Sequence, residues 1–450
     1  MSSPQRPIGS TLSAARTVLL GLQHMLIMYT GCVTVPLVFG AAAGLDERTI
    51  GLLVNADLLV AGIVTAVQSL GLKKVLGLRM PVVTGATFSA LTSMILIQGQ
   101  YGVRAVYGAM LAAGVFGLLV AVPFSRLIRF FPPLVTGVVI TVVGLSLIGT
   151  AGGMIAGPDP AAADYASIRR LAPAAAVIAI IVLLARVGRG FVGRIGVLLA
   201  LVLGTALAVP FGFVDFSGLA AAPWFGLTSP FLFGAPSFPV AAVVSMCIVM
   251  LVIFTESTAS IMAVGEATGD RVDSPRLARG LATDGFSGLL GGVFNAFLDT
   301  VYAQNVGLIG MTRVTSRYVT AVTGAILVVL GLVPKIGGLV AALPGPVIGA
   351  ASLVLFAMVA MVGISTLRRA ELDHGHNLTI AATALGVGLL PVFVPHFYHA
   401  FPAAVQVIAG SGIIDAAVVA FGLNLLFNHT GRKPAAEDTE SGTDGAGAGN

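Results

Sequence analysis

Long apolar runs separated by short polar segments cover most of this 450-residue chain. Because a membrane-spanning helix needs about 20 apolar residues, the runs predict fourteen elements that enter or cross a bilayer. These elements lie near residues 17–40, 49–71, 82–99, 105–122, 133–156, 171–186, 195–214, 238–265, 280–298, 300–313, 318–333, 346–365, 377–394 and 412–427. The third and the tenth differ from the others, because each begins with a short β-branched piece that suits an extended strand.

The tenth element holds the most polar interruption of the apolar pattern. Residues 300–304 suit an extended segment, whereas residues 305–313 could form about two helical turns that begin near Asn305. Irregular backbone at membrane depth is tolerated only where protein buries it or where it lines a cavity. The stretch therefore predicts a binding site. The alternative is a re-entrant loop or packing kink without a ligand.

The spacing of the two irregular elements predicts an internal repeat. They lie seven elements apart, which is the distance expected for two halves of seven, and an odd number makes the halves inverted. Inverted repeats with interrupted helices at matching positions are typical of secondary transporters. With a cytoplasmic N-terminus, 19 of the 24 Lys and Arg residues fall in inside segments, which agrees with the positive-inside tendency.

Composition narrows the class of protein. The chain is 57% hydrophobic and 10% charged, with a mean hydropathy of +1.00, whereas ordinary globular chains are about 25% charged. This indicates an all-α, polytopic membrane protein. The net charge of +5 is explained by the orientation of the protein in the membrane, with basic residues in the inside segments, and not by nucleic-acid binding. Two cysteines, scattered histidines and the lack of a Walker loop or nucleophile–base pair predict no metal site, no cofactor and no enzyme.

Ionisable residues at membrane depth need a reason, since burying one costs at least about 2.5 kcal/mol at a helix centre. Glu256 lies deep in the eighth element and reads as a substrate acceptor or proton carrier, or else as a neutral acid bonded to a neighbouring helix. His24 lies at the equivalent depth of the first element and is either a ligand contact or a helix–helix partner. Asp284 is a coupling site or a helix-start charge. Asp57 and Asp415 read mainly as boundary or packing residues.

The segment from Gln304 to Arg313 resembles the signature of the nucleobase-ascorbate transporter family, also called nucleobase:cation symporters. Every fixed position is filled in the order Gln, Asn, any residue, Gly, four residues, Thr. Further similar segments follow in family order. They are Gly21–His24, Gly85–Ser89, the surroundings of Glu256, and Pro334–Pro344.

The resemblance implies a fold of fourteen segments in two inverted halves, with short strands in segments 3 and 10. A core domain would comprise residues 17–132 and 238–333, and a gate domain residues 133–237 and 334–427. A cytoplasmic N-terminus (1–16) and a disordered cytoplasmic tail (428–450) would flank them. The family is commonly homodimeric.

The resemblance also implies roles for individual residues. Glu256 and Gln304 would hold the nucleobase, Asn305 would support the site, and His24 would face it. Asp284 matches an acid tied to transport, so the proton-coupling set is Glu256, Asp284 and His24. Thr87, Phe88 and Ala303 complete the expected substrate contacts. Ser260 stands where some members carry a second acid, which weakens an exact substrate assignment.

Taken together, these features predict a proton-coupled symporter that imports xanthine or urate across the inner (plasma) membrane by elevator-like motion. In the family, Gln at position 304 goes with purines, and Thr87 leans towards urate. A uracil or broader nucleobase symporter is the nearest alternative, and sodium coupling stays open. An anion transporter of the same plan would place a cation, or only backbone N–H groups, where Glu256 stands, because a carboxylate repels anions.

Overall fold

The computed structural model describes residues 8–127, 130–214, 219 and 222–429. Helices dominate the described part, and the predicted tail lies outside it from residue 430 onward. The helices of the first half are α1 (Ala14–Ala42), α2 (Glu47–Leu70), α3 (Leu91–Tyr101), α4 (Val103–Leu127), α5 (Pro133–Ser146), α6 (Ile148–Ala156), α7 (Ile168–Val187), α8 (Phe191–Arg194) and α9 (Gly196–Ala208). Those of the second half are α11 (Val240–Thr268), α12 (Ser274–Phe294), α13 (Ala303–Thr312), α14 (Arg317–Gly331), α15 (Pro334–Ala341), α16 (Gly345–Leu367), α17 (Asn377–Phe393), α18 (Ala403–Ala409) and α19 (Gly412–Asn424).

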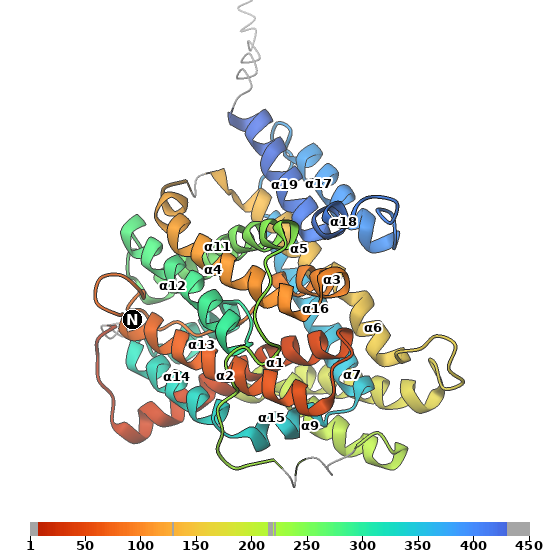
Figure 1. Ribbon diagram of the computed structural model, residues 1–450. Coiled ribbons are helices and arrows are strands. Elements are labelled where there is room, and N and C mark those ends of the chain that lie inside the picture. The colour runs from red at the N-terminus through yellow and green to blue at the C-terminus, as the bar shows by residue number, and fades with distance from the viewer. Residues whose placement is uncertain (1–7, 128–129, 215–218, 220–221, 430–450) are drawn as a thin grey trace, which may run out of the picture.

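The polytopic helical fold predicted from the sequence is confirmed (Figure 1). Each predicted element contains at least one helix, and eight helices in the described ranges are long and apolar enough to cross a membrane. A ninth span results if α14 and α15, bent by 80° at their junction, count as one. The number of fourteen crossings stays a prediction. The sequence pattern missed α15 and α18, which are only 8 and 7 residues long.

The two irregular elements meet in the structure. Strand β1 (Thr84–Ala86) pairs antiparallel with β2 (Asp299–Val301), with Gly85 opposite Thr300. After each strand the chain turns into a short helix, η1 (Phe88–Ala90) followed by α3, or α13. The predicted division of the tenth element was wrong by two to three residues. The helix begins at Ala303, a good helix former, so Gln304 lies in the first helical turn and not in the strand.

Two close helix crossings relate the halves of the chain. α2 packs against α14 at Gly62 and Gly324, where a Cβ on either glycine would lie 2.6 Å from the other's carbonyl oxygen. α4 packs against α12 in the same way, and a Cβ on Gly114 would lie 2.9 Å from the carbonyl oxygen of Gly285. α2, α4, α12 and α14 belong to the second, fourth, ninth and eleventh predicted elements. Moving α2 forward by seven elements gives α12. Moving α14 forward by seven, with the count passing from the fourteenth element back to the first, gives α4. The packing therefore follows the inverted repeat, and small residues permit it.

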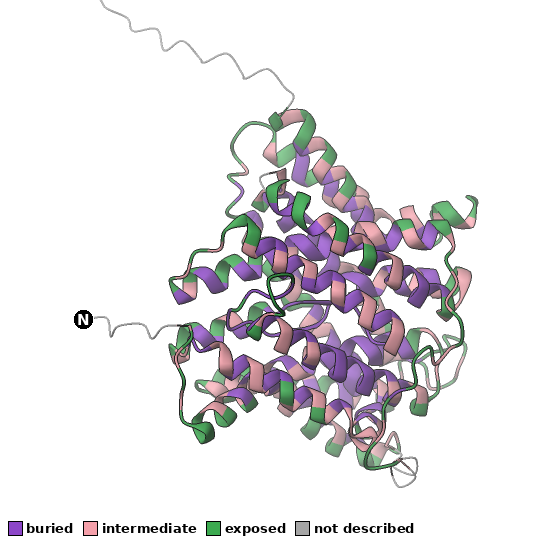
Figure 2. Ribbon diagram, turned by 60° about the vertical axis from the view of Figure 1, so that its left-hand side comes forward, coloured by how far each residue is buried: buried purple, intermediate pink, exposed green. Residues whose placement is uncertain are grey.

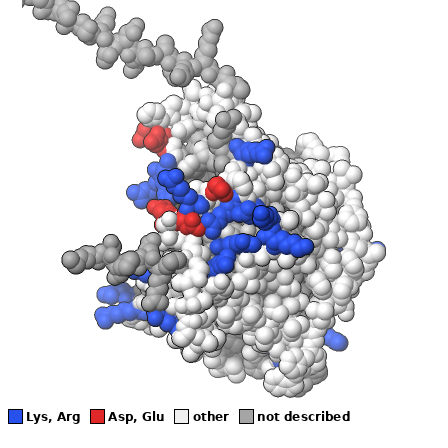
Figure 3. Space-filling model, turned by 90° about the vertical axis from the view of Figure 1, so that its left-hand side faces the viewer, with Lys and Arg blue, Asp and Glu red and all other residues white. Residues whose placement is uncertain are grey.

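Burial divides the molecule into a packed interior and an apolar exterior. Buried residues fill the centre of the bundle in Figure 2. Large apolar side chains such as Leu119 and Val182 are nevertheless exposed on the outer helix faces, as lipid contact requires. On the face that Figure 3 shows, Lys and Arg side chains gather in one region together with a few Asp and Glu, and most of the remaining surface is uncharged. These features are those of a multi-pass membrane protein.

Candidate functional site

The turn that follows β1 positions the first polar groups of the site. Thr87 has extended backbone and caps η1, because its hydroxyl oxygen accepts a hydrogen bond from the Ser89 N–H at 3.1 Å. The Thr87 N–H donates to the carbonyl oxygen of Leu298 at 2.8 Å, just before β2. Threonine and serine are suited to this position, since their hydroxyls satisfy the free N–H groups at a helix start. Both hydroxyls can still donate.

Glu256 on α11 receives those two donors. The Thr87 hydroxyl donates to Oε2 at 3.2 Å, and the Ser89 hydroxyl donates to Oε1. A carboxylate has about four acceptor positions, so two remain for a ligand. The arrangement can therefore hold a carboxylate in place while it accepts an N–H from a polar heterocycle. Sequence reasoning did not single out Ser89, although its place two residues after Thr87 in a strand-to-helix turn was an available signal.

Asn305 and His24 form a second group, which joins α13 to α1. The side-chain nitrogen of Asn305 donates to the backbone oxygen of His24 at 3.0 Å and lies 3.1 Å from His24 Nδ1. A carbonyl oxygen only accepts, so the amide nitrogen and not its oxygen must face His24. Nδ1 is then an acceptor, and the ring proton lies on Nε2. The hydrogen bond to the His24 backbone oxygen thus fixes the orientation of the Asn305 amide, and that orientation determines the tautomer of His24.

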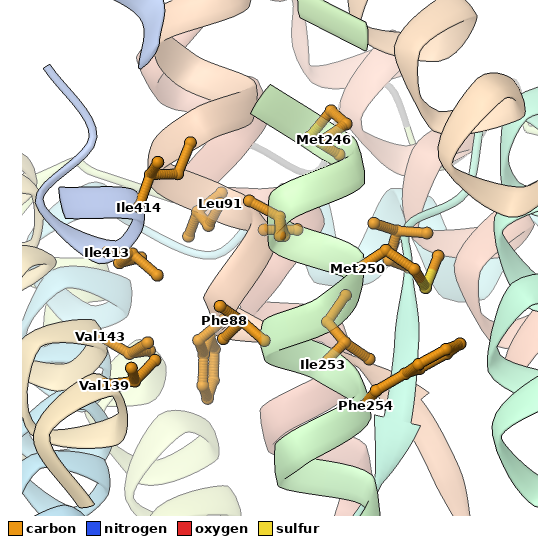
Figure 4. Packing of buried hydrophobic residues seen from close by; sticks show 14 of the residues in the cluster. Phe88, Leu91, Val139, Val143, Met246, Met250, Ile253, Phe254, Ile413 and Ile414 are labelled. Atoms are coloured by element: carbon orange, nitrogen blue, oxygen red, sulfur yellow. The ribbon is translucent and has the colours of Figure 1, made fainter. Parts of the chain in front are cut away.

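The remaining predicted contacts lie on the faces of these elements. Ala303 and Gln304 are exposed in the first turn of α13, a helix that packs against both α1 and α11. Phe88 is buried and packs edge-on against Phe356 of α16, with ring centroids 5.1 Å apart. Figure 4 shows Phe88 on the side of α11 that faces Val139 and Val143 of α5. Phe88 thus lies where helices of the predicted core and gate meet.

An arginine that the sequence pattern did not connect with this site lies beside α13. A Cβ on Gly307 would lie 2.7 Å from Nη1 of Arg194, and Gly307 follows Gln304 by one helical turn on the exposed face. Arg194 ends α8, more than a hundred residues away in the chain. No local pattern joins it to residue 307.

Buried acids lie behind the strand pair. Asp284 is fully buried on α12, and Gln68 Nε2 lies 3.5 Å from its Oδ1. The interpretation of Asp57 as a boundary residue was wrong, because it lies near the middle of α2, is 1% exposed and accepts a hydrogen bond from the Cys32 thiol at 2.8 Å. Asp415 does lie in the first turn of its helix, α19. Among the described residues, no three His, Cys, Asp or Glu side chains are grouped to hold a metal ion.

Sequence comparison identifies similar proteins over almost the whole chain. A model described as the permease family, Xan_ur_permease, matches residues 15–397. The uric acid transporter UacT of Escherichia coli is 40% identical over 94% of this chain and 89% of its own length. The uric acid permease PucK of Bacillus subtilis is 41% identical over 92% and 96%, and the xanthine permease of Bacillus subtilis 38% over 92% and 94%. The uracil permease of Bacillus caldolyticus is 29% identical over 86% and 88%.

Solved structures share the fold at low sequence identity. The murine Slc26a9 anion transporter in its inward-facing state superposes with a TM-score of 0.61 at 14% identity, covering 93% of this chain and 69% of that one. The transmembrane domain of a cyanobacterial bicarbonate transporter, BicA, gives a TM-score of 0.58 at 14% identity, covering 93% and 98%. At this identity the likeness concerns the architecture alone.

Proposed function

The chain belongs to the permease family, and from that premise we propose that it transports a purine nucleobase, urate or xanthine, across the membrane. The family membership predicted from the signature is confirmed, and so is the prediction that the protein is a transporter and not an enzyme. The observation that carries the substrate assignment is the carboxyl group of Glu256, held by Thr87 and Ser89 at the turn after the strand pair.

The chemistry of that carboxyl suits the edge of a purine-dione. Such a ring presents an N–H between two carbonyls, which a carboxylate can accept. Gln304 can both donate and accept, and its side chain is exposed at the start of α13. A ligand between the two residues would therefore meet an acceptor on one side and a mixed donor–acceptor group on the other. This pair recognises a purine-dione better than an anion without N–H groups.

The relatives favour a purine over uracil. The urate and xanthine permeases are 38–41% identical to this chain, whereas the uracil permeases of two Bacillus species are 28–29% identical. Thr87, at a position where xanthine-type members of the family often carry Asn, leans weakly towards urate. The anion transporters among the structural neighbours share only the fold, and a carboxylate at the site opposes a small anion as the substrate.

The transport mechanism in this proposal is proton symport by movement of a core domain against a gate domain. Contacts such as Phe88 with Phe356, and Ser93 with Ser411 at 3.0 Å, lie on the surface where the domains would slide. α15 packs on α2, and the Gly337 N–H donates to Asn55 Oδ1 at 3.0 Å. We therefore extend the core through α15 instead of ending it at residue 333.

The remaining parts of the proposal concern the setting of the protein. It includes the inner membrane, cytoplasmic termini and a homodimer. The gathering of Lys and Arg in one region of the face in Figure 3 supports the orientation, because positive charges are retained on the cytoplasmic face. An apolar outer groove on α7, lined by Ile178, Val182 and Leu183 among others, is a surface that lipid or a second copy would cover.

Competition uptake in a host that lacks nucleobase transporters tests the substrate. Labelled xanthine, urate and uracil are supplied at two pH values, with and without a protonophore. We expect the protein to take up urate or xanthine, and each purine should inhibit uptake of the other. The protonophore should abolish this uptake. Uracil uptake that neither purine affects would overturn the assignment.

A variant pair tests the role of Glu256. We expect Glu256→Gln to abolish transport, since an amide cannot serve as an anionic acceptor or carry the proton. Glu266→Gln, which changes an exposed acid near the end of the same helix, should transport normally. Purine uptake by Glu256→Gln at the parent rate would remove this residue from its proposed role.

A further inference from the structure

Three carboxyl groups behind the strand pair lack the hydrogen-bond donors that burial requires. Asp57 is 1% exposed, and Asp284 and Asp299 are fully buried, on α2, α12 and β2 respectively. Four of their six oxygens have no hydrogen-bond partner, namely Asp57 Oδ1, Asp284 Oδ2 and both oxygens of Asp299. Buried polar atoms are nearly always paired. These oxygens therefore call for donors beyond the hydrogen bonds present among the described residues.

The surrounding groups supply few donors and no compensating charge: Gln68 and Ser257 face Asp284, and the Phe297 backbone faces Asp57. The Cys32 thiol already donates to Asp57 Oδ2, and the Tyr302 and Tyr107 hydroxyls donate to the backbone oxygens of Ala86 and Asn295. The charges that act on Asp299 are those of Asp57 and Asp284. The salt bridges found among the described residues join Arg170 to Asp164 and Arg276 to Asp270, away from these acids.

A proton is the ligand that satisfies this arrangement. An ionised carboxylate only accepts hydrogen bonds, whereas a protonated one also donates. A protonated Asp299 thus gains a hydrogen to donate, and Asp57 Oδ1 and Asp284 Oδ2 are acceptors without donors. A metal ion fits less well, because no suitable group of three ligands exists within the described residues. Three neighbouring acids in a dry interior also cannot all be charged.

We propose that Asp57, Asp284 and Asp299 form a proton-binding cluster behind the strand pair, which holds a transported proton at a place separate from Glu256. This inference rests on the proposed function, and it adds Asp57 and Asp299 to the machinery that couples transport to protons. In the transfer step, the O–H bond of Asp299 breaks and an O–H bond forms on the carboxylate of Asp284 or Asp57. The total charge of the cluster is unchanged by that step.

Short contacts connect the cluster with the substrate side. The Asp299 N–H donates to Ser287 Oγ at 3.1 Å, and Ser287 donates to the Asp284 backbone oxygen at 2.7 Å. The hydroxyls of Ser257 and Thr300 lie 3.0 Å apart, and Ser257 follows Glu256 in the chain. Loss of the proton places negative charge directly behind β2, so it changes the electrostatic environment of the strand that positions the site.

Asp299→Asn is the decisive variant, because it keeps the size of the side chain and removes its ability to exchange a proton. Two assays in vesicles separate coupling from substrate handling. We expect urate exchange without a gradient to stay within about threefold of the parent, and accumulation driven by a proton gradient to fall at least tenfold. The pH dependence of accumulation should flatten. Asp415→Asn, which changes a partly buried acid of α19, serves as the matched control and should leave both assays unchanged.

Three outcomes would overturn the cluster. The first is parent-like accumulation and pH dependence in both Asp299→Asn and Asp57→Asn. The second is equal loss of exchange and accumulation in folded Asp299→Asn, which indicates a purely structural role. The third is accumulation that follows a sodium gradient and ignores the proton gradient.

Infrared spectroscopy tests the cluster independently of the substrate. In purified Glu256→Gln, a band from protonated carboxyl groups should remain at neutral pH, and adding Asp299→Asn should reduce it. An unchanged band would refute the cluster even if urate transport is confirmed. Conversely, failure of purine uptake by the parent protein would refute the proposed function and leave this measurement valid.

Discussion

Replacing Asn305 with aspartate tests the link between α13 and α1 with almost no change in shape. The parent amide nitrogen donates to the backbone oxygen and to Nδ1 of His24, at 3.0 and 3.1 Å, and Asn305 is 2% exposed. A carboxylate has no hydrogen to donate, so both bonds are lost and two oxygens face each other. A lost bond and a buried unpaired acceptor together cost about 2–4 kcal/mol. This corresponds to roughly 30- to 700-fold in an equilibrium constant.

We expect Asn305→Asp to bind urate weaker by a factor in that range, because the population with an assembled site falls. Equilibrium binding of labelled urate to the purified protein measures the effect. Asn377→Asp is the matched control. Its amide also bridges two backbone oxygens, those of Ala370 and Glu371 at 3.0 and 3.3 Å, but it lies far along the chain from the site. Parent-like affinity in Asn305→Asp would refute both the hydrogen-bond assignment and the tautomer of His24.

Three further predictions follow from the described contacts. Gln304→Glu should weaken purine uptake and admit uracil, since an ionised Glu only accepts; competition uptake that still excludes uracil and keeps purine affinity would contradict it. Gly324→Ala should lower thermal stability by about 1–3 kcal/mol, because its Cβ would lie 2.6 Å from the Gly62 carbonyl oxygen, whereas Gly386→Ala, with open space around it, should not. Asp46→Ala removes the cap of α2, where the Thr49 N–H and hydroxyl lower the pKa of Asp46; unfolding should show a loss of about 1 kcal/mol at neutral pH. That difference should vanish as the pH falls through the lowered pKa, and a difference that persists in acid would contradict the capping role.

The sequence predicted those parts of the fold that produce a contrast along the chain. Apolar runs marked the helices, and the β-branched, glycine-bearing pieces that begin at residues 82 and 300 marked the two broken elements. Glu256 was visible because a carboxyl at membrane depth stands out from its neighbours. Short helices such as α15 were missed, since eight residues carry too little pattern to separate them from a loop.

The missing site residues are those whose role depends on residues distant in the chain. Ser89 is an ordinary hydroxyl until α11 brings Glu256 to it. Asp299 directly precedes the stretch that the sequence singled out, but nothing local showed that Asp57 and Asp284 would lie near it. Arg194 reaches Gly307 from another part of the chain. These relations arise from helix packing, which a linear pattern does not encode.

The strand pair also constrains how the protein is made. Because β1 bonds to β2, the backbone groups of β1 that face β2 have no strand partner until the ribosome has synthesised residues 299–301, whereas those of Thr84 already bond to the Thr65 hydroxyl on α2. Exposed peptide groups are not tolerated in lipid, so the nascent chain must shelter β1 during the synthesis of more than two hundred residues. Neither half of the gene product can complete the site by itself. Separately expressed halves would recover transport only by finding each other in the membrane.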